Sequence, residues 1–292
     1  MTEVFIGVVS HAGSRFLANT GPDGLAQRLA HRMSSPTTYV AVRVNTENAW
    51  SPTVLPITDD LVQASHRAQL DVEARWQAYL EGRTGRRARK ALELLARRVR
   101  PFDATSGHRG IQRLVNIELS HRALIRDGLT SGADWILILE DDGASLDPDE
   151  CARGITALLA STRAHPKPAF VNLSESFTPR QLGIDHLLTP AEGTSWAGAV
   201  PRRVLQAERP VTNTVCAIAY RATFAEEVLR RLDAKGLAPV VPIDWKLNDI
   251  LMDMVHERRL AAGDCWLVDP APVMQLSMRS TASLPDSAET AS

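Results

Sequence analysis

The sequence lacks the cysteines that a disulfide framework or a zinc cluster would need. Only three occur among its 292 residues, and they are widely separated in the chain. An odd number of scattered cysteines is typical of proteins from a reducing compartment. Small buried thiols are the simplest interpretation of such residues. We therefore expect Cys151, Cys216 and Cys265 to be buried and unpaired.

Long hydrophobic runs are also missing. The apolar run at residues 4–9 ends at Ser10 and His11, and it is too short for a signal peptide or a membrane span. No other segment approaches the roughly 20 apolar residues that spanning requires. We therefore predict a cytoplasmic protein without a membrane span, although its substrate could sit on a membrane.

An excess of charge of either sign is absent as well. The chain has 33 Lys and Arg against 34 Asp and Glu, a formal net charge of −1. No overall field favours nucleic acid, so no nucleic-acid partner is predicted, and any anionic ligand must be held by local groups. A hydrophobic content of 44% suits one large domain over residues 1–280. Residues 281–292 have little to bury and are expected to form a disordered tail. The oligomeric state stays open.

The patterns that are present alternate between strands and helices. Residues 4–9 form an apolar, β-branched run typical of a buried strand, and Leu25, Leu29 and Met33 follow at helical spacing. Residues 110–129 repeat the spacing of an amphipathic helix. This alternation predicts an α/β fold, a Rossmann-like and mostly parallel sheet flanked by helices. Further strands are expected at residues 37–44, 135–139, 169–173 and 215–219, and further helices at 224–232 and 247–255.

One segment stands apart from this alternation. Residues 60–100 are charged and helical in pattern, and residues 83–100 contain eight Lys or Arg against one acid. We interpret the segment as a helical insertion. It is either a solvated helical hairpin or a mobile basic lid over a diphosphate or an anionic acceptor.

The most informative stretch is an apolar strand that ends in three acids. Residues 135–139 are followed directly by Glu140, Asp141 and Asp142. Adjacent carboxylates repel one another unless a cation lies among them, and hard oxygen ligands suit Mn²⁺ or Mg²⁺. Since successive strand residues face opposite sides, Glu140 and Asp142 are the expected metal ligands and Asp141 faces away. A solvated turn or a helix N-cap, as expected at Asp147, is the alternative.

Four ordered stretches resemble the lipooligosaccharide-type glycosyltransferases of family 25, relatives of the collagen galactosyltransferases. The resemblance covers roughly residues 105–280. The stretches are Asn-Ile-Glu-Leu-Ser-His-Arg-Ala-Leu at 116–124, Ile-Leu-Ile-Leu-Glu-Asp-Asp at 136–142, Thr-Asn-Thr-Val-Cys-Ala-Ile-Ala-Tyr at 212–220 with the helix at 224–232, and Pro-Ile-Asp-Trp at 242–245, with 270–280 similar to the family's closing Pro, Gln and Ser positions.

The resemblance implies a GT-A fold, a nucleotide-sugar donor, a divalent metal, and transfer with inversion. We expect the acceptor to be a glycan or a small molecule. The sequence departs from the family in two places. Thr212 or Asn213 stands where the family has glycine. The N-terminal third matches only as a strand followed by a loop with Arg15, which leaves the sugar and the acceptor open.

In such a transfer a carboxylate outside the metal cluster removes the proton of the acceptor hydroxyl. Asp244 is the first candidate for this base. Trp245 beside it could form a sugar platform and raise its pKa by desolvation. Asp249, further along the same helix, is the second candidate. The structural alternative makes Asp244 the N-cap of a helix over residues 245–255.

Other residues are candidates for contacts with the donor. Asp141 and Arg15 are expected near the nucleotide, although Arg15 could equally be a surface side chain. Asn213 and Thr214 suit sugar hydroxyls, but turn chemistry explains them as well. His121, on the expected helix, is either a satisfied, partly buried histidine or a contact of the metal site.

Two other classes of protein fit the same acidic strand end. A metal-dependent nucleotidyltransferase also places carboxylates beside nucleotide phosphates. Its usual glycine-rich loop with a lysine is not evident near residues 9–15. A non-catalytic protein that binds nucleotides or glycans on the same scaffold is the third possibility.

Overall fold

The structure of the protein is a computed structural model. This structure describes residues 2–11, 14–35, 38–81, 104–162, 168–175, 178–194, 196–198, 200–212 and 214–278. Asn213, the basic residues 83–100 and the expected tail at 281–292 lie outside these ranges. Within them, no helix combines the length and the apolar character needed to cross a membrane.

An eight-stranded sheet forms the centre of the fold. Its order is β2 (Thr38–Asn45), β1 (Thr2–Val9), β3 (Trp135–Glu140), β9 (Ala217–Arg221), β5 (Phe170–Asn172), β10 (Cys265–Asp269), β8 (Arg203–Ala207) and β7 (Leu188–Pro190). Strand β1 pairs in parallel with β2 and β3, and β5 with β10. Strand β9 is antiparallel to both of its neighbours, and β8 is antiparallel to β10 and β7.

The expected α/β architecture is therefore confirmed, with most strands of the sheet running in one direction, and β8 and β9 are the two strands that make the sheet mixed. Parallel neighbours need a crossover connection, usually a helix. Strands β7 and β8 are instead joined by the short segment 191–202, and residues 208–216 lead into β9 without a helix among those described. The sequence pattern marks strands but not the connections that set their direction.

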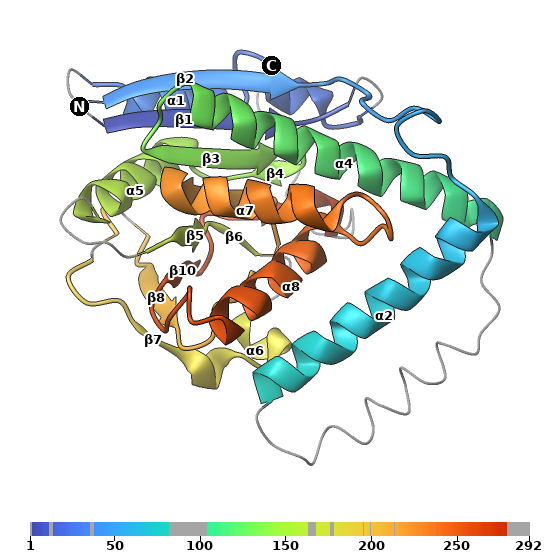
Figure 1. The fold of residues 1–292 in the computed structure, drawn as a ribbon. Coiled ribbons are helices and arrows are strands. Elements are labelled where there is room, and N and C mark those ends of the chain that lie inside the picture. Colours follow the sequence, from blue (N-terminus) through green and yellow to red (C-terminus); the bar gives the residue numbers. More distant parts are fainter. Residues whose placement is uncertain are drawn as a thin grey trace, which may run out of the picture.

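Helices cover both faces of this sheet (Figure 1). On one face, α1 (Leu25–Met33) and α5 (Pro148–Ser161) pack on Val4, Ile6 and Val8 of β1. On the other face, α4 (Ala104–Thr130), α7 (Ala222–Lys235) and α8 (Ile243–His256) pack on Phe5 and Val9. The alternation along β1 thus divides its side chains between two cores, as in a doubly covered strand.

Helix α2 (Asp59–Glu81) lies outside these layers and packs against α4 and α8 (Figure 1). Its Val62 joins Ile111, Val115 and Val240 in a small separate core. The helical pattern expected for residues 60–100 is confirmed as far as Glu81. The helix adds an outer wall beside the sheet edge where β3 ends.

A small second sheet follows the end of β3. It has the order β4 (Gly143–Ala144), β11 (Val273–Gln275) and β6 (Ser174–Glu175). A short helix α6 (Pro179–Leu182) and 3-10 turns at Leu17–Thr20, Asp185–Leu187 and Leu276–Met278 complete the described elements. The second sheet matters because it holds the C-terminal segment against the acidic strand end.

The N-termini of α5 and α8 and the three cysteines test further expectations from the sequence. Asp147 caps α5 by accepting hydrogen bonds from the backbone N–H groups of Asp149 and Glu150, as predicted. The three cysteines are buried and unpaired. Helix α8 begins earlier than the N-cap alternative for Asp244 requires. Its N-cap is Pro242, and Asp244 belongs to the first helical turn.

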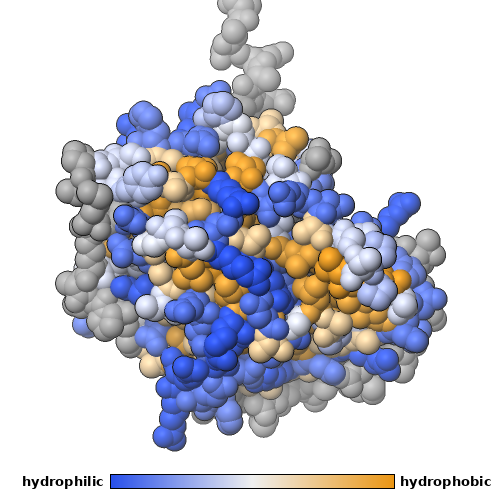
Figure 2. Space-filling model, turned by 45° about the horizontal axis from the view of Figure 1, so that its top comes forward, coloured by the Kyte–Doolittle hydropathy of each residue, from blue (hydrophilic) through white to orange (hydrophobic). Residues whose placement is uncertain are grey.

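Hydrophobic and hydrophilic areas share the molecular surface. Figure 2 shows hydrophobic areas on either side of a hydrophilic band on one face. The large hydrophobic side chains that are exposed come from separate parts of the chain and include Leu17, Tyr39, Val54, Leu146 and Val200. Scattered exposure of this kind is ordinary for a globular protein.

Candidate functional site

The mixed topology brings several strand ends to one edge of the sheet. The carboxyl ends of β1 and β3 lie side by side there, and the backbone N–H of Asp141 donates to the Val9 carbonyl at 3.0 Å. Because β9 is antiparallel to β3, the residues that enter β9 reach the same edge. The backbone N–H of Glu140 donates to the Cys216 carbonyl at 2.8 Å.

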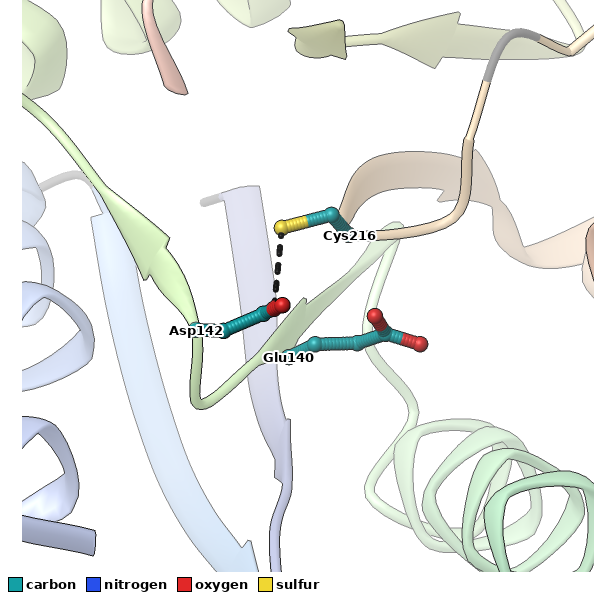
Figure 3. A group of neighbouring side chains, drawn as sticks. All are labelled: Glu140, Asp142 and Cys216. Carbon is teal, nitrogen blue, oxygen red and sulfur yellow. Dashed lines mark hydrogen bonds between the residues drawn. The ribbon is translucent and has the colours of Figure 1, made fainter. Parts of the chain in front are cut away.

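Glu140, Asp142 and Cys216 form a cluster at this edge (Figure 3). One potential ligand atom from each residue lies within 4.8 Å of the others. The thiol of Cys216 points at Asp142, with 3.6 Å between Sγ and Oδ1. Burial raises the pKa of Asp142, and the charge of Glu140 raises it further, although a hydrogen bond from Ser277 opposes both.

Asp141 faces away from this cluster, as the strand alternation predicts. The Ser10 hydroxyl donates to its Oδ2 at 2.6 Å, and the Asn19 amide donates to its backbone carbonyl at 2.9 Å. Both donors belong to the segment after β1. Asp141 thereby fixes the loop that contains Arg15, at the position where a nucleotide was expected.

Two side chains, His121 and Gln275, contact the carboxylate of Glu140. The His121 side chain, 1% exposed, comes from α4 and places Nε2 at 3.4 Å from Oε1. Gln275, at the end of β11, places Nε2 at 3.5 Å from Oε2. The Nδ1 atom of His121 is buried and has no hydrogen-bond partner among the residues that the structure describes. These contacts are long, so they orient Glu140 while leaving its oxygens with spare acceptor capacity.

The cluster suits a divalent cation. Two carboxylates are the usual protein contribution to a Mn²⁺ or Mg²⁺ site, in which water and phosphate oxygens supply the remaining ligands. Glu140 and Asp142 meet this requirement. Cys216 adds a softer sulfur donor, but burial and the neighbouring carboxylates raise the pKa of its thiol well above the ordinary value, so it stays protonated in this structure.

A pocket of about 380 Å³ opens beside Glu140. Its walls come from the start of α8, the middle of α2 and α4, and the segment before β9. Glu140, Thr214, Asp244 and Trp245 all line it, so four of the predicted site residues meet there. Most of the remaining lining is apolar, with Val72, Trp76, Leu114, Ile117, Leu182, Val215, Pro242 and Ile243, and its other polar members are Arg113, Thr212, Asn248 and Gln275.

Asp244 is the second acidic group of the pocket. It is partly buried in the first turn of α8. Burial raises the pKa of Asp244 from its ordinary 3.8 to about 6, and the charge of Glu140 contributes in the same direction. A hydrogen bond from the backbone N–H of Trp245 and the proximity of His121 act in the opposite direction. An acid with this pKa is mostly ionised at pH 7 and can accept a proton.

Two other predicted residues lie in different surroundings. Asp249 pairs with Arg75 and Lys235, with 2.8 Å between its Oδ2 and Lys235 Nζ, and it is not part of the pocket lining. Arg15 is exposed, and its guanidinium lies 4.7 Å from the centre of the Phe16 ring. Asn213 lies outside the described residues. Asp244 is therefore the better placed of the two candidate bases.

Sequence reasoning missed four members of this site. Cys216 was expected only as a buried thiol, and nothing in its spacing indicates Asp142 as a neighbour. Trp76 and Arg113 come from α2 and α4, and their contribution depends on how these helices pack. Gln275 lies within the stretch 270–280, whose resemblance to the family's closing positions was the one available signal.

The comparisons with known proteins do not add to this geometry. No protein-family model matches the chain, and no curated protein is significantly similar to it. Any functional conclusion therefore depends on the arrangement of the side chains described above.

Proposed function

We propose that this protein is a metal-dependent glycosyltransferase of the GT-A type, which transfers a sugar from a nucleotide-sugar donor to an acceptor hydroxyl with inversion. The observation that carries the proposal is a set of uncompensated acids beside a pocket. Within the described chain, Glu140, Asp142 and Asp244 form no ion pair with Lys or Arg.

Other buried acids of this protein do have cationic partners. Glu118, which is fully buried, accepts a hydrogen bond from Lys246 Nζ at 2.6 Å, and Glu150 lies 3.6 Å from Arg202. Unpaired buried carboxylates are costly, because they repel one another and lose their hydration. A ligand that carries positive charge would remove this cost at the acidic strand end, and a divalent cation meets that need.

Each residue of the site then has a chemical role. Glu140 and Asp142 would hold the metal, which would neutralise the diphosphate leaving group of the donor. His121 and Gln275 orient Glu140. Asp244, which lines the same pocket but lies outside the metal cluster, accepts the proton of the acceptor hydroxyl as that oxygen attacks the anomeric carbon.

The remaining groups of the pocket suit a sugar. The Trp245 ring, whose centroid lies 6.4 Å from that of Trp76, offers an apolar face to a pyranose. The Thr214 hydroxyl donates to Gln275 Oε1 at 3.2 Å and faces the same pocket. An apolar pocket with a few convergent polar groups is the usual form of a small-molecule site.

The first test measures metal-dependent turnover of the donor. The purified chain is incubated with a panel of nucleotide sugars, with Mn²⁺, with Mg²⁺ or with EDTA, and release of nucleoside diphosphate is followed. Slow hydrolysis of one donor that requires the metal is expected. Asp142→Asn should abolish this hydrolysis, while Glu226→Gln, an exposed acid on α7, serves as the matched control and should retain it.

Two outcomes would overturn the proposal. Pyrophosphate release from nucleoside triphosphates, with no hydrolysis of any nucleotide sugar, would identify a nucleotidyltransferase. Metal-dependent thermal stabilisation by a nucleotide sugar without any turnover, in the presence of a panel of acceptors, would identify a binding protein. A ligand at about 100 times its dissociation constant stabilises the native state by ~2.7 kcal/mol, so binding itself is readily measured.

A further inference from the structure

The pocket has a cationic end that the proposed chemistry does not use. Arg113 lines the pocket and is exposed, and among the residues that the structure describes its guanidinium has no acid partner. Other arginines near this pocket differ in this respect, since Arg75 and Arg122 of the flanking helices α2 and α4 pair with acids. A guanidinium at a pocket wall presents several N–H donors in a fixed plane, which suit carboxylate, sulfate or phosphate oxygens.

The position of Arg113 relative to the acidic cluster follows from helix geometry. Arg113, Ile117 and His121 are spaced by four residues, so they follow one face of α4. Arg113 and Ile117 line the pocket, and His121 contacts Glu140. Eight residues at about 1.5 Å per residue separate Arg113 from His121 by about 12 Å along the helix axis. The pocket is therefore acidic at one end and basic at the other.

Two aromatic side chains lie in the wall of the same pocket. Trp76 of α2 and Trp245 of α8 have their ring centroids 6.4 Å apart, with an angle of 43° between the ring planes. Helix α2 packs against α8 (Figure 1). Because a tilted pair presents an apolar surface rather than a closed stack, it can receive a flat ring or a pyranose face.

We propose that the acceptor is an elongated, ring-containing molecule with an anionic group, whose ring contacts Trp76 and Trp245 and whose anion is held by Arg113. This rests on the proposed glycosyl transfer, since the hydroxyl that reacts lies at the Asp244 end. The anion cannot lie at that end, because Glu140 and Asp244 would repel it. The donor diphosphate does not explain Arg113 either, since its place is at the acidic cluster, two helical turns away.

The test uses glycosides of one length that differ in charge at one end. The probes are 4-carboxyphenyl, 4-sulfophenyl and neutral 4-carbamoylphenyl β-glycosides, each as the glucoside and the galactoside. Binding to the full chain is measured by calorimetry at low ionic strength and pH 7.5. At least one anionic probe should bind about three to ten times more tightly than its neutral counterpart, as expected for a charge-assisted hydrogen bond at a partly solvated site.

Variants then assign this preference to one residue. Arg113→Gln should remove the preference, so that the anionic and the neutral probe bind this variant with about equal affinity. Arg153→Gln is the matched control, since this exposed arginine lies on α5, on the opposite face of the sheet. The control should keep the full preference. The relative affinities of the carboxyl and sulfo probes identify which anion the guanidinium favours.

Several results would overturn the inference. It is wrong if neither anionic probe binds, if the neutral probe binds equally well, or if Arg113→Gln retains the preference. It is also wrong if that variant loses affinity for nucleoside diphosphates while the preference persists, because Arg113 would then serve the donor. The failure of the proposed function can be distinguished from this, because donor hydrolysis depends on Glu140 and Asp142. If the protein hydrolyses no donor but keeps its preference for anionic probes, the proposed function is wrong and the anion site at Arg113 still stands.

Discussion

Replacing Asp244 by asparagine should make the protein more stable at neutral pH. The raised pKa of Asp244, about 6 against an ordinary 3.8, means that the folded protein binds this proton more tightly than the unfolded chain does. Stability from this group is therefore highest at low pH and falls as the pH rises from about 4 to about 6. Asparagine keeps the shape of the side chain and removes the buried charge.

The size of the effect follows from the pKa. Each tenfold change in proton affinity corresponds to about 1.36 kcal/mol. At pH 7.5 the ionised Asp244 should cost the folded state about 3 kcal/mol, and at pH 4.5 only about 1 kcal/mol. Every other carboxylate is common to both proteins, so the difference in free energy of unfolding between variant and wild type isolates this group.

Urea unfolding at the two pH values measures this difference directly. The experiment is done in EDTA, because a cation at Glu140 would favour the ionised form of Asp244 and lower its pKa. Adding Mn²⁺ should then reduce the difference in free energy of unfolding between Asp244→Asn and the wild type. The reasoning is refuted if Asp244→Asn is no more stable than the wild type at pH 7.5. It is also refuted if the difference in free energy of unfolding between the two proteins is as large at pH 4.5 as at pH 7.5.

The same variant tests the catalytic role. Loss of a general base should reduce sugar transfer to an acceptor by about 10²–10⁴-fold while binding of the donor persists. Transfer by the wild type should decline as the pH falls below about 6, because the protonated Asp244 cannot accept the hydroxyl proton. A stable variant with unimpaired transfer would move the base to another residue.

Three further predictions concern the neighbours of the site. His121→Asn should weaken Mn²⁺ binding about 10- to 100-fold, measured by titration with electron paramagnetic resonance, because outer contacts orient metal ligands; unchanged affinity would show that the histidine is only a packing residue. Trp245→Ala should weaken acceptor binding about tenfold in calorimetry, whereas Trp245→Phe should retain most of it, because the ring face makes the contact; equal losses would contradict a ring platform. Glu118→Gln should lower the free energy of unfolding by about 3–5 kcal/mol, since Lys246 would remain buried without an acid partner and Arg122 would keep only Asp233; a loss below 1 kcal/mol in urea unfolding would contradict this.

The elements with strong periodicity could be predicted from the sequence. The acidic end of β3 was located because an uninterrupted apolar run stops at Glu140, and α4 because its apolar positions recur at helical spacing. The opposite orientation of Asp141 also followed from strand geometry alone. These features depend on residues close together in the chain, where the backbone repeat fixes which side chains share a face.

The choice between Asp244 and Asp249 could not be made in this way. Both are acidic residues of one short helix, and the carboxylate of either could act as a base. Five residues at about 100° each place their side chains about 140° apart around the axis of α8. Asp244 lines the pocket, while Asp249 meets Arg75 and Lys235 from α2 and α7. Only the packing of neighbouring helices determines which side of α8 faces the site.

The direction of β9 also could not be predicted from the sequence, and it determines which residues reach the acidic end of β3. A parallel β9 would place its entry residues at the far end of the sheet, away from Glu140. Because β9 is antiparallel, Thr214 and Cys216 reach the edge where β3 ends, and the Cys216 thiol meets Asp142. The acidic strand end thus gains a hydroxyl and a thiol from this segment but no Lys or Arg. A site with this many acids and no Lys or Arg partner among the described residues is more stable once a cation is bound, which makes metal-dependent stability its most direct thermodynamic signature.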